Sequence, residues 1–276
     1  MALDPEQLGQ SKADLAETLR TMRKRAGLSQ VRLALRCNMS QSKISKIETA
    51  EITPNLVDVE LILRAVEAPK QLVAEITSLA RLANTAWEPI RSSFRRGLEK
   101  RQAELAGLET EAKELRYFLP AMITGLLATP EYIRASLEYS PGDTSKTVAR
   151  KLERQAVLYD TTKCFTFLIT EQAVRWAVVP PPAMAVQIDR LTSLSHLPNI
   201  RMGLIPLGTI ISRGPMNTFT VYEDRLATVE TFTGRTVFRD SRDIAEHLEL
   251  FKQYEQKAQF GGAARTLLQE WASLYR

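Results

Sequence analysis

The sequence predicts a mainly α-helical protein, with an N-terminal helical bundle, a helical linker and a mixed α+β domain at the C-terminal end. Apolar residues recur at helical spacing through the first third of the chain, whereas β-type runs occur only after Cys164. The length of 276 residues is enough for one large or two ordinary domains. We expect residues 1–86 to form the first domain, 87–115 the linker and 116–276 the α+β domain.

Composition indicates an ordinary soluble protein. The 44% hydrophobic and 25% charged residues match globular averages, and no run approaches the roughly 18 apolar residues of a membrane span. Residues 1–10 lack the basic start and apolar run of a secretory signal. Two cysteines are too few for a disulfide framework or a cysteine zinc cluster. We therefore expect a cytoplasmic protein without membrane contact.

Positive charge is concentrated near the N-terminal end. The net charge of +5 supports a polyanionic partner only weakly by itself. Between Thr18 and Ile47, however, no acidic residue interrupts the basic ones. These basic residues are Arg20, Arg23, Lys24, Arg25, Arg32, Arg36, Lys43 and Lys46. The excess coincides with a compact pattern of helices, which distinguishes it from an ordinary solvated surface.

The first predicted helix covers about residues 14–25. Its apolar side chains recur at helical spacing, and Gly27 suits the end of a helix. A later helix follows Asn55 and stops at Ala68-Pro69. Its apolar stripe consists of Leu56, Val59, Leu63 and Val66.

Two short helices are predicted between these. The second begins after Ser29 and ends near Asn38, a residue that tolerates the left-handed conformation of a tight turn. The third covers residues 41–48 after its N-cap Ser40. The apolar side chains expected to face the first helix are Leu33, Cys37, Met39, Ile44 and Ile47.

This arrangement fits a helix-turn-helix unit whose first position is Gln30. Two helices that cross at a sharp angle need a small residue where they approach, and Ala34 stands at that point. Asn38 supplies the turn residue with positive φ, where glycine is commoner. The third helix therefore qualifies as a recognition helix that can enter the major groove of duplex DNA.

The geometry predicts which side chains meet DNA. The outward residues of the third helix are Gln41, Ser42, Lys43, Ser45 and Lys46. Gln41 suits a bidentate contact with adenine, and Lys43 suits guanine or a phosphate. Gln30 would bond a phosphate oxygen and help to fix the docking angle. Sequence-independent attraction through counterion release is expected from Arg23, Arg32 and Arg36.

The residues 28–34 and 39–48 resemble the xenobiotic-response-element family of helix-turn-helix regulators, which includes phage repressors of the lambda and Cro type. The resemblance covers roughly residues 14–68 and implies a lambda-repressor-like bundle. It departs from the family pattern at Cys37-Asn38, where Leu-Gly is typical.

The rest of the chain is similar to the C-terminal domain of actinobacterial antitoxin-like regulators. The residues that carry this similarity are Leu108-Glu109, Phe118-Leu119-Pro120, the stretch 125–132 and Leu197-Pro198-Asn199-Ile200. The resemblance implies a small partner protein, often encoded nearby, that modulates DNA binding.

The second half of the chain alternates strands and helices. Residues 70–116 have a mostly helical pattern with a break at Trp87-Glu88-Pro89, and Glu223-Asp224-Arg225 is expected to turn a hairpin. The β-type runs are 164–170, 200–206, 219–222, 227–230 and 235–238. The predicted helices start at Pro130 after Thr129, and cover 145–159, 171–177, 183–195, 242–258 and 263–275.

No enzymatic chemistry is predicted. The sequence has no Walker-type phosphate loop and no dinucleotide fingerprint after a strand. His196 and His247 lack partners at metal-ligand spacing, and no nucleophile has a base at a suitable spacing. Cys37 and Cys164 are better explained as small buried hydrophobes. We therefore expect no catalytic residues, no metal and no cofactor.

Three residues of the second domain are candidates for binding a partner or ligand. Glu171 and Glu230 each stand at the end of a β-type run, although capping or solvent exposure is the ordinary role of such acids. Trp176 could line a pocket with Tyr222 and Phe232, although an aromatic core is the default.

These observations predict a transcriptional regulator that binds a pseudo-palindromic DNA site as a homodimer, with half-sites about 34 Å or a multiple apart. The C-terminal domain would bind a small partner protein that modulates DNA binding. The alternative is a one-component sensor, or even a cryptic hydrolase, whose C-terminal domain binds a small-molecule effector. An exposed apolar groove would favour the partner, and a closed polar pocket would favour the small molecule.

Overall fold

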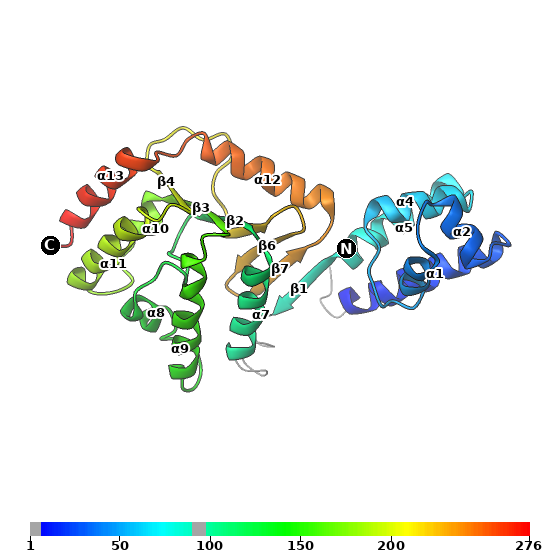
Figure 1. Ribbon diagram of the computed structural model, residues 1–276, viewed down its shortest axis with the longest axis horizontal. Coiled ribbons are helices and arrows are strands. Elements are labelled where there is room, and N and C mark those ends of the chain that lie inside the picture. The colour runs from blue at the N-terminus through cyan, green and yellow to red at the C-terminus, as the bar shows by residue number, and fades with distance from the viewer. Residues whose placement is uncertain (1–6, 90–97) are drawn as a thin grey trace. The chain divides into compact units, whose positions relative to one another are not determined.

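The computed structural model describes residues 7–89 and 98–276, and its contacts divide the chain into two compact units (Figure 1). One unit contains the chain up to Glu88 together with Thr236–Ile244. The other contains Pro89–Arg235 and Ala245–Arg276.

The N-terminal unit is built from short helices, as the apolar spacing predicts. These helices are α1 (Gln7–Arg25), α2 (Gln30–Arg36), α3 (Gln41–Glu48), α4 (Leu56–Ala65) and α5 (Lys70–Asn84). Polar side chains cap three of them: Ser29 Oγ accepts the amide of Arg32 at 3.2 Å, and Ser40 Oγ accepts that of Lys43 at 3.1 Å. Asn55 caps α4 in the same way. Local side-chain chemistry therefore sets where α2, α3 and α4 begin.

The second unit contains most of a mixed sheet whose strand order is β1-β7-β6-β5-β2-β3-β4. The strands are β1 (Thr85–Pro89), β2 (Glu114–Leu119), β3 (Cys164–Thr170), β4 (Ile200–Ile205), β5 (Phe219–Tyr222), β6 (Leu226–Thr231) and β7 (Gly234–Phe238). Strands β2, β3 and β4 are parallel, whereas β5 is antiparallel to both β2 and β6. The predicted fold class, helical bundle followed by an α+β domain, is confirmed.

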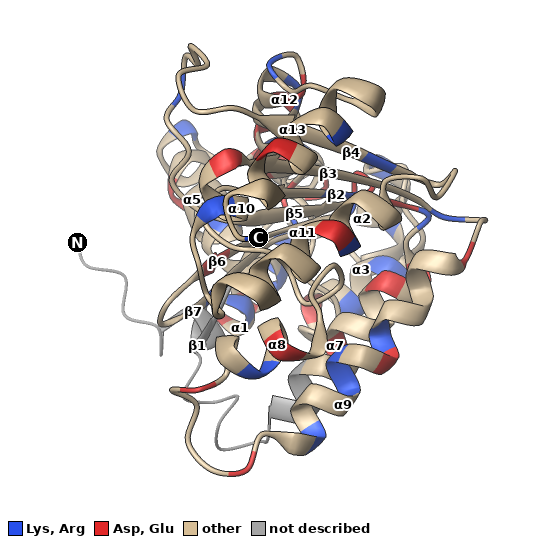
Figure 2. Cartoon of the chain, turned by 90° about the vertical axis from the view of Figure 1, so that its left-hand side faces the viewer, with Lys and Arg blue, Asp and Glu red and all other residues tan. Residues whose placement is uncertain are grey.

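Helices cover the sheet on both faces (Figure 1). They are α7 (Leu98–Glu111), α8 (Pro130–Ser136), α9 (Ser145–Arg154), α10 (Glu171–Arg175), α11 (Pro181–Leu194), α12 (Ser241–Glu255) and α13 (Gly261–Ser273). On one face, Phe118 of β2 stacks on Tyr254 of α12 with ring centroids 4.1 Å apart. The opposite face looks toward α7, α8 and α9, and Figure 2 marks the charged residues along α9.

Several elements differ from the sequence prediction. The stretch predicted as mostly helical contains two strands, β1 and β2, and the helix predicted over 145–159 changes to a 3-10 helix at Gln155–Tyr159. Cys164 is exposed at the start of β3, so its expected burial is wrong, because the strand becomes enclosed only from Phe165 onward.

The range predicted as a linker, 87–115, contains α7, which packs against α9 and belongs to the second unit. Residues 90–97 of that range lie outside the described residues. None of the helices in the described part of the chain is both long and apolar enough to cross a membrane.

Candidate nucleic-acid interface

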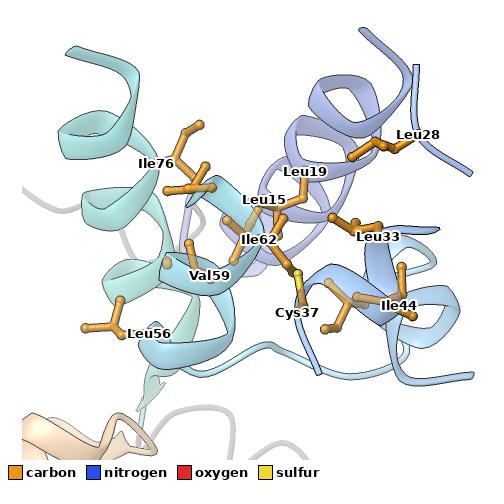
Figure 3. Close-up of a cluster of buried hydrophobic side chains, with 14 residues drawn as sticks. Leu15, Leu19, Leu28, Leu33, Cys37, Ile44, Leu56, Val59, Ile62 and Ile76 are labelled. Atoms are coloured by element: carbon orange, nitrogen blue, oxygen red, sulfur yellow. The ribbon is translucent and has the colours of Figure 1, made fainter. Parts of the chain in front are cut away.

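The position of α3 is determined by a hydrophobic core that all five N-terminal helices share (Figure 3). Ile44 and Ile47 of α3 are fully buried against side chains such as Leu15 of α1 and Leu33 of α2. The turn between α2 and α3 has Asn38 at φ 53°, the left-handed conformation predicted for it. Two helices held in this way leave one side of α3 free for solvent.

The exposed side of the two helices carries the polar residues that the sequence predicts. Gln41, Ser42 and Lys46 of α3 are exposed, and Lys43 and Ser45 are half-buried. On α2, Arg32 and Arg36 are exposed and Gln30 is half-buried. The structure therefore brings most of the predicted DNA-contacting residues together around the N-terminal ends of two adjacent helices.

A buried ion pair lies beneath this surface. Arg23 Nε donates to Glu48 Oε1 at 2.5 Å, and Arg23 Nη2 donates to Glu48 Oε2 at 2.9 Å. The Arg23 side chain is 11% exposed and that of Glu48 is 4% exposed. Arg23 also donates to the Leu28 carbonyl at 2.7 Å, so that α1, the loop before α2 and α3 are tied together.

Hydrogen bonds lead from this pair to the surface. Gln30 Nε2 donates to Glu48 Oε2 at 2.9 Å, and Gln41 Nε2 donates to Gln30 Oε1, also at 2.9 Å. An ionised carboxylate only accepts hydrogen bonds, so Glu48 orients the Gln30 amide with its nitrogen inward. The Gln30 oxygen must then accept from Gln41, which leaves the Gln41 oxygen and one N–H hydrogen for a ligand.

The electrostatics agree with an ionised Glu48. Burial by itself would raise the pKa of the Glu48 carboxyl, but hydrogen bonds from Arg23 and Gln30 outweigh burial and lower that pKa below its ordinary value. The hydrogen bond to Glu48 raises the pKa of Arg23. Near neutral pH the carboxylate is therefore charged, as the orientation of Gln30 requires.

The place of Arg23 corrects its predicted role. The sequence analysis expected its charge to attract phosphates, but the side chain is buried and its guanidinium is occupied by Glu48 and Leu28. The stretch from Thr18 to Ile47 contains no acidic residue, which made Arg23 look unpaired, but its partner Glu48 is the next residue after that stretch. Glu48 itself was not singled out from the sequence, although an acid directly after the buried Ile47 was a usable signal.

Other predicted contacts have protein partners as well. Lys43 Nζ lies 2.7 Å from Asp58 Oδ1 of α4, and Lys46 Nζ lies 3.5 Å from Glu51 Oε1. Arg36 Nη1 donates to the Ala65 carbonyl at 2.9 Å while remaining exposed. The Lys46–Glu51 pair is exposed, and exposed ion pairs contribute little to stability, whereas the Asp58 side chain that pairs with Lys43 is only 10% exposed.

The candidate residues of the second domain do not form one site. Glu230 is exposed at the end of β6 and lines a cavity with Tyr222 and Phe232. Glu171 and Trp176, which follow β3, do not line that cavity: Glu171 Oε2 accepts the Leu207 amide at 2.9 Å, and Trp176 is 59% exposed. Within residues 7–89 and 98–276, no three His, Cys, Asp or Glu side chains form a group suited to a metal ion.

Comparison with known proteins gives two family matches. Residues 14–76 match a family described as a helix-turn-helix domain, and residues 102–270 match one described as a domain of unknown function, DUF5753. The first match confirms the predicted helix-turn-helix in the N-terminal unit. No curated protein matches the chain.

Among solved structures, the chain is similar to one described as "Structure of TrmBL2, an archaeal chromatin protein, shows a novel mode of DNA binding". The two are 12% identical with a TM-score of 0.34, and the match covers 73% of this chain and 66% of the archaeal one.

Proposed function

The chain belongs to the DUF5753 family, and because its N-terminal unit is a helix-turn-helix domain we propose that it is a transcriptional regulator that recognises specific duplex DNA sequences through α3. The carrying observation is the hydrogen-bonded series from Glu48 through Gln30 to Gln41. It holds an exposed amide at the N-terminal end of α3 in a defined orientation before any DNA is present.

This orientation suits adenine in the major groove. The edge of adenine presents the N6 amino donor and the N7 acceptor. Gln41 Oε1 can accept from N6 while the remaining Nε2 hydrogen donates to N7, and its other hydrogen stays on Gln30. Because the amide is already oriented, little side-chain entropy is lost on binding.

Phosphate contacts supply the rest of the affinity in this proposal. Arg32, Arg36 and Lys46 are exposed cations on α2 and α3, and Lys43 is half-buried next to them. Ser42 and Ser45 add hydroxyls on the same helix. These groups attract any duplex through counterion release, whereas Gln41 discriminates among sequences.

A mobility-shift titration at two salt concentrations separates the two roles. The full chain would be titrated with its selected DNA site and with random duplex of equal length. Gln41→Ala should weaken binding to the selected site by about 1–3 kcal/mol and leave random duplex unchanged. The control Arg32→Ala should weaken both and reduce the salt slope by about one. Equal losses on both duplexes for Gln41→Ala would contradict base reading.

We propose that the regulator acts as a homodimer. Two copies of a recognition helix read half-sites about 34 Å or a multiple apart, so the DNA site should be pseudo-palindromic. Sedimentation of the complex should give two chains per duplex. A complex of one chain on a site without inverted symmetry would refute the dimer.

At a finer level, we propose that the helix-turn-helix is of the xenobiotic-response-element type and that the second domain is antitoxin-like, with a small partner protein that modulates DNA binding. The support is the resemblance of residues 28–34, 39–48 and 125–132 to those proteins. Native mass spectrometry of the chain from its own cells should detect a stoichiometric small protein. A preparation that contains only the chain and still binds its DNA site under cellular conditions would oppose this.

The proposal includes no catalytic activity, and it assigns the protein to the cytoplasm in association with the nucleoid. The support for this location is the exposed basic side chains on the helices of the N-terminal unit. Fluorescence imaging of the tagged full chain should show it over the chromosomal DNA, and a peripheral distribution would argue against the proposal.

A further inference from the structure

The second unit contains a cavity of about 370 Å³ between the sheet and the helices α7, α8 and α9. Strands β2, β5 and β6 form one wall, and the helices form the opposite one. Binding sites for small molecules generally occupy about 300–1,000 Å³. The cavity is therefore large enough for a small ligand.

Hydroxyl groups line the sheet wall in register. Tyr117 of β2 pairs with Thr220 of β5, which pairs with Thr228 of β6, so the three side chains form a row across the strands. Tyr222 stands two residues after Thr220 and projects from the same face. All four residues line the cavity. Phe219, which precedes Thr220, packs on the other face, against Phe251 of α12.

Three of these residues are buried, and their hydroxyls form no hydrogen bond within the described part of the protein. Thr220 is 6% exposed, and Thr228 and Tyr222 are each 3% exposed. None of the three hydroxyls hydrogen-bonds to any described residue, and their oxygens open to the cavity rather than being sealed in protein. Hydroxyl groups of buried residues are ordinarily hydrogen-bonded, because a buried hydroxyl without a hydrogen-bond partner destabilises the fold. Their partners must therefore come from what fills the cavity.

A charged pair lines the cavity without leaving net charge. Arg154 Nε donates to Glu109 Oε2 at 3.0 Å, and the two side chains are 9% and 2% exposed. Tyr117 Oη donates to Glu109 Oε1 at 3.3 Å. Two further lining residues, Lys151 and Glu230, carry opposite charges. A charged ligand would lose its hydration in this cavity and would find no unpaired opposite charge among the described lining residues to replace it.

The tyrosine hydroxyls of this wall stay protonated. Burial, with a smaller contribution from Glu109, raises the pKa of Tyr222 and holds the pKa of Tyr117 well above its ordinary value. Tyr222 can therefore donate as well as accept a hydrogen bond to a bound molecule.

Apolar side chains complete the lining. Ile133 of α8 and Leu137 after it face the cavity, and Met122 and Phe232 are exposed at its rim. We propose that this cavity binds a small uncharged molecule that has several hydroxyl groups on one side and an apolar part on the other. The Thr220, Thr228 and Tyr222 hydroxyls bond its polar side, and Ile133, Leu137 and Phe232 contact its apolar part.

The proposal identifies a site for the effector of the sensor alternative, but it uses residues of the second unit alone. It is tested by direct binding and needs no DNA. A failure of DNA recognition through α3 therefore leaves it standing, and its own failure leaves DNA recognition standing.

Two neutral probes of this chemistry are phenyl β-D-glucopyranoside and phenyl β-D-xylopyranoside, and phenyl phosphate and benzylamine are charged comparison molecules. Saturation-transfer NMR with the full chain at millimolar probe concentrations should detect a neutral probe and not the charged ones. Absence of transfer to both neutral probes, or a stronger signal from a charged probe, would overturn the proposal.

Variants that remove single hydroxyls locate the binding. Thr220→Val and Tyr222→Phe should each weaken the neutral probe about three- to tenfold, because each deletes one hydrogen bond. Both should unfold thermally like the parent, since neither hydroxyl has a protein partner. The matched control Tyr254→Phe removes a hydroxyl on the other face, bonded to the Arg213 carbonyl, and should bind the probe normally. Unchanged affinity in both cavity variants would overturn the assignment.

Discussion

Replacement of Arg23 by methionine should loosen the helix-turn-helix far more than a surface substitution would. Methionine keeps an unbranched apolar stem in place of the arginine stem but leaves the Glu48 carboxylate, only 4% exposed, without its countercharge. Removing one partner of a buried ion pair costs about 3–5 kcal/mol, and the 11% exposure of Arg23 favours the lower end. Three kcal/mol corresponds to about a hundredfold shift of the opening equilibrium.

Hydrogen exchange of the full chain measures this shift in the N-terminal unit alone. Peptides that cover α1 and α3 should lose about a hundredfold of their protection in Arg23→Met, while peptides of the second unit stay unchanged. The double variant Arg23→Met with Glu48→Leu should regain much of the loss, because no charge remains buried. A loss below threefold in Arg23→Met, or an equally large loss in the double variant, would refute the reasoning.

Three further predictions concern single groups. The pKa of Glu48 is lower in the folded state, so the stability that its carboxylate contributes is complete above the unfolded pKa of about 4.3 and disappears as the pH falls through the folded pKa. Hydrogen exchange from pH 6 to 3 should therefore show a smaller loss of stability in Glu48→Gln than in the parent. Equal slopes in the two proteins would exclude the effect. Ala50 adopts φ 57°, so Ala50→Gly should stabilise the N-terminal unit by up to about 1 kcal/mol in the same assay, and destabilisation would contradict this. A Cβ on Gly203 would lie 2.6 Å from Phe260 Cζ, so Gly203→Ala should lower the free energy of unfolding, measured by urea denaturation, by about 1–3 kcal/mol. In the control Gly262→Ala the added Cβ meets nothing within 4 Å, and the stability should not fall. Similar losses in both variants would argue against a packing cause.

The helix-turn-helix could be predicted because its signals are local. Ser29 and Ser40 cap helices within three residues of themselves, and Asn38 determines the turn at its own position. Ile44 and Ile47 identify the buried side of α3 by spacing alone. Each of these features depends on neighbours a few residues away, which a sequence displays directly.

The features that could not be predicted from the sequence depend on residues that are far apart in the chain. Strand β2 follows a charged helix without a turn signal, and its pairing partners begin at Cys164 and Phe219. Arg23 finds Glu48 25 residues later, which converts an expected surface charge into a buried one. The row from Tyr117 to Thr228 exists only once β2, β5 and β6 are in register. Long-range pairing therefore decided the elements that were missed.

Selection of duplexes from a random pool by the full chain tests the reading of DNA by α3 most directly. The wild-type protein should enrich two inverted half-sites about 34 Å or a multiple apart, each with an adenine at the position that Gln41 reads. The Gln41→Ala protein should enrich the same half-sites with that one position relaxed. If the wild-type protein enriches no sequence, or if the variant retains the adenine, recognition through α3 is contradicted.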